Sequence, residues 1–139
     1  MVDHLTPEKR SVNMSKIRSV DTKPELIVRK FLFSQGFRYR THDKTLPGKP
    51  DIANKKRKIA VFIHGCFWHQ HEGCKRATMP KSNKDYWMKK LENNKLHFQS
   101  IFDELLSLKY NVFIIWECEV KSQDNLNKLY RDIIQIAEA

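Results

Sequence analysis

The sequence lacks long apolar runs, a leader-like N-terminus and a full set of paired cysteines. No run of about 18 apolar residues occurs anywhere in the chain, so no transmembrane helix is expected. The N-terminal residues MVDHLTPEKR do not show the basic and then apolar pattern of a signal peptide. Three cysteines are an odd number, which does not fit a disulfide framework. These absences predict a soluble, cytoplasmic protein whose cysteines are buried or bind a metal ion.

Acidic side chains are scarce compared with basic ones. Sixteen Asp and Glu stand against 26 Lys and Arg, which gives a formal net charge of +10 and a pI near 9.6. The excess is uneven, because residues 1–65 carry 15 basic and 6 acidic groups, whereas residues 111–139 carry 3 and 5. A polyanion such as DNA is the natural partner for the first half of such a chain. Charge alone is also compatible with a basic domain that binds no polyanion.

The hydrophobic pattern predicts one α/β domain. A chain of 139 residues buries a single core, and no internal repeat or low-complexity segment divides it. The apolar segments IAVFI and NVFIIW have the character of buried strands, and the long amphipathic segment between them predicts a crossover helix, so these strands should be parallel. Asp21 and Thr22 are expected to cap one helix, and a Ser82–Asp85 capping box is expected to begin another. The expected elements are helices over residues 7–19, 23–35, 82–108 and 123–139, and strands over residues 37–43, 51–54, 58–65 and 111–118. Together they make a three-layer α/β fold with a mixed central sheet.

The segment HGCFWHQHEGC, residues 64–74, concentrates side chains that bind metals. Cys66, His71 and Cys74 have the spacing C-x4-H-x2-C, which is short enough for one loop to surround a tetrahedral ion. Cys118 ends the last predicted strand, and two adjacent parallel strands that end at the same sheet edge would bring it to Cys66. Four protein ligands leave no open position, so the pattern predicts a structural zinc ion. The simpler alternative is three buried cysteines and a chance histidine.

A second group of polar residues surrounds the predicted hairpin. Asp51 follows the turn LPGKP, and pairing across the hairpin would bring it near residues 62–64. His64 and His69 leave the carboxyl end of a buried strand, where α/β sheets place their sites, and Glu25 is an acid within a hydrophobic helix. A Pro-Asp pair before a strand is the layout of the metal-dependent PD-(D/E)xK nucleases, although FIH stands here in place of the (D/E)xK element.

The chain resembles the very short patch repair (Vsr) DNA mismatch endonucleases over essentially its whole length. The segments that carry the resemblance are, in chain order, MSKIRSVDTKPE, LPGKPDI, VFIHGCFWHQHEGC and VFIIWEC. The resemblance implies a restriction-endonuclease-like fold, with an N-terminal DNA-contacting arm over residues 1–20 and an endonuclease domain over residues 21–139. It implies a Mg2+-dependent hydrolase that nicks duplex DNA 5′ of the T in T·G mismatches left by deamination of 5-methylcytosine. The expected products are a 5′-phosphate and a 3′-hydroxyl. The implied context is a monomer that acts on mismatched double-stranded DNA, with a functional link to a cytosine-5 DNA methyltransferase.

The resemblance also implies roles for individual residues. Asp51 would bind Mg2+ through its carboxylate, and Ile63, where the family has threonine, through its backbone carbonyl. Glu25 and His64 would hold the water shell of the metal, and His69 would act as the general base or acid. The implied structural zinc ligands are Cys66, His71, Cys74 and Cys118, and the implied DNA contacts are Phe67, Trp68 and Trp87 as an aromatic wedge and Met14 and Ile17 in the arm.

General physical reasoning supports these roles but leaves alternatives. An imidazole with a pKa of about 6.5 can move a proton where oxygen-bound Mg2+ supplies charge, so a catalytic lysine is not essential. Phe67 and Trp68 are either a wedge that opens a base step or ordinary core residues. Basic groups that would bind phosphates are Lys16, Arg18, Lys49 and the hairpin tip 55–58, which could also be a merely solvated tip. Two other functions stay open: a restriction-type nuclease of the same fold that cuts matched duplex, and a zinc-stabilised DNA-binding module without catalysis.

Overall fold

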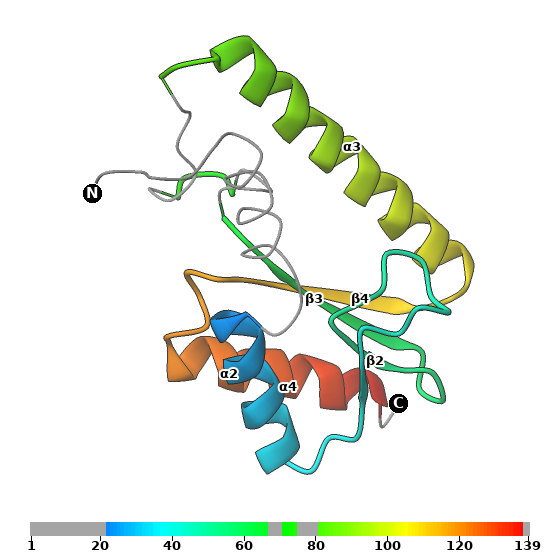
Figure 1. Cartoon of the computed structure of the whole chain (residues 1–139). Coiled ribbons are helices and arrows are strands. Elements are labelled where there is room, and N and C mark those ends of the chain that lie inside the picture. Colours follow the sequence, from blue (N-terminus) through cyan, green and yellow to red (C-terminus); the bar gives the residue numbers. More distant parts are fainter. Residues whose placement is uncertain (1–21, 67–70, 75–80, 138–139) are drawn as a thin grey trace.

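A four-stranded sheet and three helices make up the part of the chain that the computed structural model describes, residues 22–66, 71–74 and 81–137 (Figure 1). In chain order the elements are α2 (Lys23–Ser34), β1 (Arg40–Thr41), β2 (Ile52–Asn54), β3 (Ile59–His64), α3 (Lys84–Ser107), β4 (Asn111–Trp116) and α4 (Gln123–Ala137). The helix predicted over residues 7–19 lies outside the described residues. The order of the other elements confirms the prediction of a mixed α/β domain.

The strands form one mixed sheet in the order β1-β2-β3-β4. β2 and β3 are antiparallel neighbours, as the predicted hairpin requires. β3 and β4 are parallel, with a register that runs from Ile59 opposite Asn111 to His64 opposite Trp116. This pairing confirms the expected crossover through α3, and it ends both strands at the same edge of the sheet.

Helices cover both faces of the sheet because the side chains of β3 alternate between them. Ile59 and Val61 pack in a core with α2 and α4, whereas Ala60 and Phe62 pack against the C-terminal half of α3 around Leu105. All four of these strand residues are buried, which explains why the sequence of β3 shows no alternation of apolar and polar residues. Figure 1 shows α2 and α4 together below the strands and α3 above them, with the first turns of α3 extending beyond the sheet.

Two local predictions need correction, and a third holds only in part. β1 is only two residues long, rather than 37–43, because Arg40 and Thr41 are the residues that pair with the short strand β2. The N-cap of α3 is Asn83, in a left-handed conformation with φ 55°, so the helix begins one residue later than a Ser82 capping box would place it. Of the two residues expected to cap α2, Thr22 is the N-cap, but its side chain makes no capping hydrogen bond.

Gly48, in the turn that precedes Asp51, is required by both its conformation and its surroundings. Its φ is +72°, and a Cβ at this position would lie 2.5 Å from Cγ2 of Ile101 in α3. Ile101 is β-branched and packs in the core between α3 and the sheet, so it cannot easily move aside. The turn therefore packs closely against α3.

Gly48→Ala should lower the free energy of unfolding by about 3 kcal/mol, from left-handed strain and overpacking combined. Gly36→Ala is the matched control, because Gly36 has φ +86° but no atom within 4 Å of the position that a Cβ would take. That variant should lose only about 1–2 kcal/mol. Urea unfolding of both variants measures the difference, and equal losses would contradict the role of the Ile101 contact.

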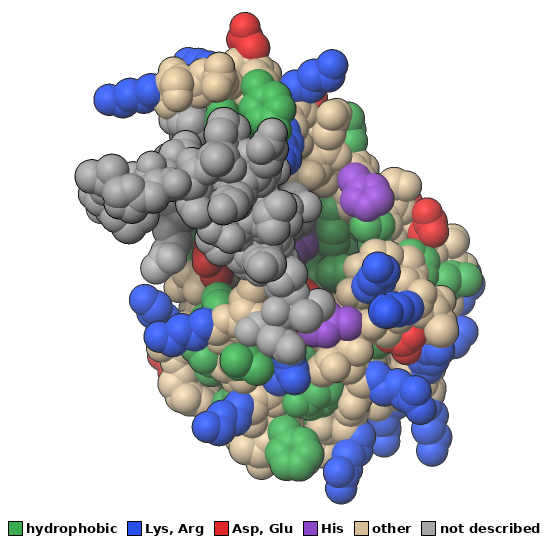
Figure 2. All heavy atoms as spheres, in the orientation of Figure 1, with side chains coloured by type: hydrophobic (Ala, Val, Ile, Leu, Met, Phe, Trp, Pro, Cys, Tyr) green, Lys and Arg blue, Asp and Glu red, His purple; other side chains and the backbone are tan. Residues whose placement is uncertain are grey.

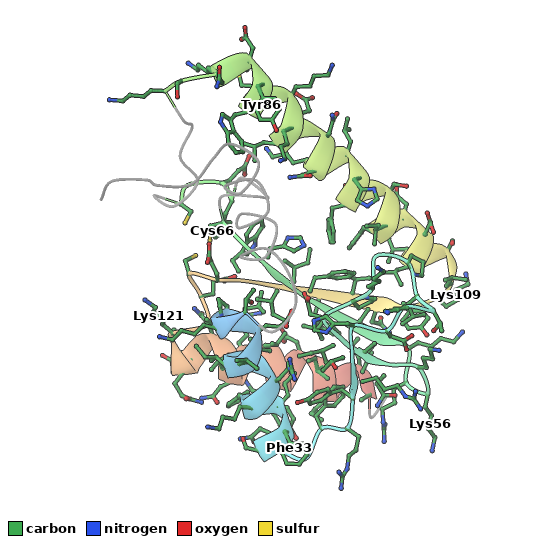
Figure 3. All side chains as sticks on the ribbon, viewed as in Figure 1. Phe33, Lys56, Cys66, Tyr86, Lys109 and Lys121 are labelled. Atoms are coloured by element: carbon green, nitrogen blue, oxygen red, sulfur yellow. The ribbon has the colours of Figure 1, made fainter. Side chains whose placement is uncertain are left out.

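The surface carries basic side chains away from the sheet edge at which β3 and β4 end. Residues 55–58 at the hairpin tip and Lys109 are exposed, and Figure 2 shows Lys and Arg side chains gathered at the lower right of the face it displays, the side on which Figure 3 labels Lys56 and Lys109. Among the described helices, none is long and apolar enough to cross a membrane.

Candidate functional site

A carboxylate cluster forms where α2, β1 and β2 meet. Glu25 lies in the first turn of α2, His42 directly follows β1, and Asp51 directly precedes β2. The ligand atoms of these three side chains all lie within 4.8 Å of one another. Nε2 of His42 is 3.0 Å from Oε1 of Glu25 and 3.9 Å from Oδ1 of Asp51. Two carboxylates and an imidazole at these distances could hold a metal ion.

Asp51 is held by the strand that faces it across the hairpin. The backbone N–H of Ile63 donates a hydrogen bond of 2.7 Å to Oδ2 of Asp51, so Asp51 does approach residues 62–64 as the sequence predicts. Burial, a hydrogen bond shared with Glu25 and the nearby charge of Glu25 raise the pKa of Asp51 to about 8, although the Ile63 N–H opposes this shift. A bound cation would relieve the repulsion between the two carboxylates.

Glu25 is buried although it lies on a helix that packs largely through apolar side chains. Only 4% of its surface is exposed, and besides His42 it meets Arg29, whose Nη1 lies 3.6 Å from Oε2. A buried carboxylate requires such partners or a metal ion. Its place in the first turn of α2 also lets the helix dipole stabilise its negative charge.

His42 is a member of this cluster that the sequence reasoning missed. Its signal is its place in the segment RTHD, which by itself predicts only an alternating strand. Because Thr41 pairs with Ile52, the next residue after β1 lies opposite Asp51, and the backbone N–H of His42 donates a 3.3 Å hydrogen bond to the carbonyl of Asp51. Register with Asp51 is therefore the information that could have identified it.

A second cluster lies beyond the ends of β3 and β4. The ligand atoms of Cys66, His71, Cys74 and Cys118 all lie within 4.8 Å of one another, so the parallel strands bring Cys118 to Cys66 as expected. Nδ1 of His71 is 3.7 Å from Sγ of Cys66 and 3.5 Å from Sγ of Cys118. Figure 3 shows Cys66 just past the end of β3, near the point where the chain leaves β4. These four side chains could hold a metal ion.

Backbone and ring contacts shape this cluster. The backbone N–H of Cys66 donates to Oε1 of Glu117 at 2.9 Å, and the N–H of His71 donates to the carbonyl of Cys66 at 3.0 Å. The His71 ring stacks on Trp116, with ring centres 4.1 Å apart and an angle of 8° between the planes. Burial, followed by the neighbouring thiols, raises the pKa of Cys66 to about 12. A cation is the partner that would favour thiolates here.

His64 lies between the two clusters, at the last position of β3. It is buried, and its ring makes edge-on contacts with Phe98 of α3 and Trp116 of β4. The distances between ring centres are 4.3 and 5.0 Å. It directly follows Ile63, whose N–H supports Asp51, and it comes two residues before Cys66. A short stretch of chain therefore joins the carboxylate cluster to the cysteine cluster.

The remaining predicted residues fall into two groups. Trp87 lies half-buried in the first turn of α3, beside the exposed Tyr86. Nζ of Lys90 lies 5.6 Å from the centre of the Trp87 ring. Lys49 is exposed in the turn before Asp51. Those that lie outside the described residues are Met14, Lys16, Ile17, Arg18, Phe67, Trp68 and His69.

Comparison with known proteins reveals relatives over nearly the whole chain. The family described as DNA mismatch endonuclease Vsr matches residues 2–76. The type II nicking enzyme V.NmeAIP of Neisseria meningitidis is 48% identical over 137 residues, which cover 96% of this chain and 97% of that protein. The type II nicking enzyme V.XorIIP of Xanthomonas oryzae is 42% identical, with 96% and 98% covered. The DNA mismatch endonuclease Vsr of Escherichia coli is 32% identical, with 91% and 80% covered.

Proposed function

The chain belongs to the DNA mismatch endonuclease Vsr family, and from this premise we propose that it is a Mg2+-dependent, strand-specific endonuclease that nicks duplex DNA 5′ of the T in T·G mismatches. The observation that carries the proposal is the meeting of Glu25 and Asp51 beside the end of β3. The names of the relatives, a mismatch endonuclease and nicking enzymes, support the reaction class. The proposal includes a restriction-endonuclease-like fold, action as a monomer and a functional link to a cytosine-5 DNA methyltransferase.

The carboxylate cluster suits phosphodiester hydrolysis. A divalent cation there would neutralise the scissile phosphate and lower the pKa of a bound water. In the proposed arrangement Asp51 and the backbone carbonyl of Ile63 would hold the cation, and Glu25 and His64 would hold its water molecules. The hydrogen bond from Ile63 N–H orients the Asp51 carboxylate before substrate binds. His69, in its proposed role, moves the proton.

The cysteine cluster suits a structural zinc ion. Zinc ligands at about 2.3 Å for sulfur and 2.1 Å for nitrogen lie roughly 3.6 Å apart in a tetrahedron. The distances from His71 to Cys66 and Cys118, 3.7 and 3.5 Å, fit this spacing. With Cys74 the donor set is three thiols and one imidazole, which is typical of closed structural sites. Zinc here would fasten the segment after β3 to the end of β4.

The proposed DNA contacts follow from charge and from the projecting part of α3. The first turns of α3 extend beyond the sheet (Figure 1), where Figure 3 labels Tyr86. Trp87 and Lys90 belong to the same turns. We assign Trp87, with Phe67 and Trp68, to an aromatic wedge that opens the duplex at the mispair, where unstacking costs least. Basic groups of the N-terminal half, including Lys49, would bind phosphates.

The proposed specificity predicts a large difference between two duplexes that differ in one base. With Mg2+, the T-containing strand of a T·G duplex should be nicked about a hundredfold faster than the corresponding strand of a matched C·G duplex, because opening a matched pair costs a few kcal/mol more. Strand-labelled oligonucleotides resolved on a denaturing gel measure both rates. Mismatches in several sequence contexts and omission of Mg2+ provide the controls. Equal cutting of both duplexes would support a restriction-type nuclease, and binding without any nicking would support a non-catalytic module.

A further inference from the structure

His42 belongs to the carboxylate cluster but has no role in the mechanism proposed above. Its side chain is 20% exposed and lies against Glu25, whose side chain is 5% exposed, and Asp51, at 22%. It is therefore a nitrogen donor facing two oxygen donors at the centre where the reaction is proposed to occur.

The spacing of these donors fits one metal ion. Ligand atoms in neighbouring positions of an octahedral ion, each about 2.1 Å from it, lie roughly 3.0 Å apart. Nε2 of His42 and Oε1 of Glu25, which share a hydrogen bond, are 3.0 Å apart, and the distance from Nε2 to Oδ1 of Asp51 is 3.9 Å. Small side-chain movements would bring all three atoms onto one ion.

The backbone holds His42 in this place. Its N–H donates to the carbonyl of Asp51, and the preceding residue, Thr41, is the last to pair with β2. Its φ is +48°, a left-handed conformation that is uncommon for residues other than glycine. The turn from β1 thus directs the imidazole toward the two carboxylates, and the hydrogen bond to Asp51 couples the positions of both residues.

We propose that His42 is a direct nitrogen ligand of the catalytic cation, with Asp51 and Glu25 as oxygen ligands, and that the site therefore favours divalent transition-metal ions such as Mn2+ over Mg2+. The proposal rests on the proposed function and refines it, since Glu25 then contacts the ion itself rather than its water shell. Imidazole suits transition metals, whereas Mg2+ prefers oxygen. The imidazole nitrogen therefore adds more affinity for Mn2+ than for Mg2+.

The test compares metal binding by the full-length, zinc-loaded protein and its His42→Gln variant. The amide oxygen of glutamine replaces the imidazole nitrogen with a donor that Mg2+ accepts. Isothermal titration calorimetry should show Mn2+ affinity falling about tenfold or more and Mg2+ affinity changing less than about threefold. Asp51→Asn is the control that should weaken both metals. An equal change for both metals would mean that His42 only positions the carboxylates, and no change would mean that it does not touch the ion; either result overturns the proposal.

A spectroscopic readout separates this proposal from the proposed function. Pulsed electron paramagnetic resonance of bound Mn2+ should show coupling to a histidine nitrogen, which should disappear in His42→Gln and persist in His69→Gln. Coupling in a protein that nicks no DNA would refute the proposed function and leave this ligand in place. Nicking of T·G duplexes without any nitrogen coupling would refute His42 as a ligand and leave the proposed function in place.

Discussion

Replacing Asp51 with asparagine should lower the rate of nicking of a T·G duplex by roughly a thousandfold or more. A metal ion that stabilises the transition state of phosphate hydrolysis contributes several kcal/mol, and each 1.36 kcal/mol corresponds to a factor of ten. Asn lacks the negative charge that such an ion requires. The expected loss is therefore catalytic, and binding of the mismatched duplex should change little.

Asparagine is the informative substitution because it preserves the local structure. Its side-chain oxygen can still accept the hydrogen bond that Ile63 N–H donates to Asp51, whereas alanine would leave this N–H without that acceptor. The substitution also removes a carboxyl group whose pKa is raised by burial and by Glu25, so the fold should not lose stability. Asp132→Asn, at a position of α4 whose side chain is 43% exposed, is the control for loss of one carboxylate.

Single-turnover rates with excess enzyme, DNA affinity from gel shifts and a thermal melt together test this expectation. Lost nicking with preserved binding and melting temperature supports Asp51 as the metal-binding carboxylate. Nicking within about tenfold of the wild-type rate would contradict that assignment, because a single hydrogen bond accounts for a change of that size.

Replacing Cys118 with serine should remove the structural metal and destabilise the protein. We expect one zinc ion per chain in the wild type and close to none in the variant. A zinc ion there would join the segment after β3 to the end of β4, so losing it removes metal-binding free energy that stabilises the folded state. Loss of roughly 3 kcal/mol of stability would lower the melting temperature by about 10 °C.

The comparison variants decide whether the four ligands act as one site. Cys74→Ser and His71→Asn should lose the metal as Cys118→Ser does, whereas Glu72→Gln, exposed in the same segment, should retain it. Elemental analysis after dialysis against a weak chelator gives the zinc content. Zinc content unchanged by Cys118→Ser would reject the four-ligand site, and so would a wild-type protein that contains no zinc.

The fold was predictable where the hydrophobic pattern is continuous. β3, β4 and the helix between them follow from long apolar and amphipathic segments, whose period depends only on local geometry. The length of β1 and the N-cap of α3 were not predictable in the same way. Strand length depends on how far the partner β2 extends, and the cap depends on a left-handed Asn83 that competes with an equally plausible Ser82.

In the candidate site, too, the residues that local sequence determines were predictable and those that tertiary packing determines were not. The identity and spacing of Cys66, His71 and Cys74 are local, and the approach of Cys118 follows from the parallel strand order, so the residue pattern was sufficient to predict that cluster. The pairing of Asp51 with the strand across the hairpin was predictable for the same reason. The third donor of the carboxylate cluster was not, because no spacing rule connects His42 to Glu25, 17 residues away on a different element. Only the packing of α2 against the turn after β1 joins them, and this contact depends on tertiary structure rather than on local sequence.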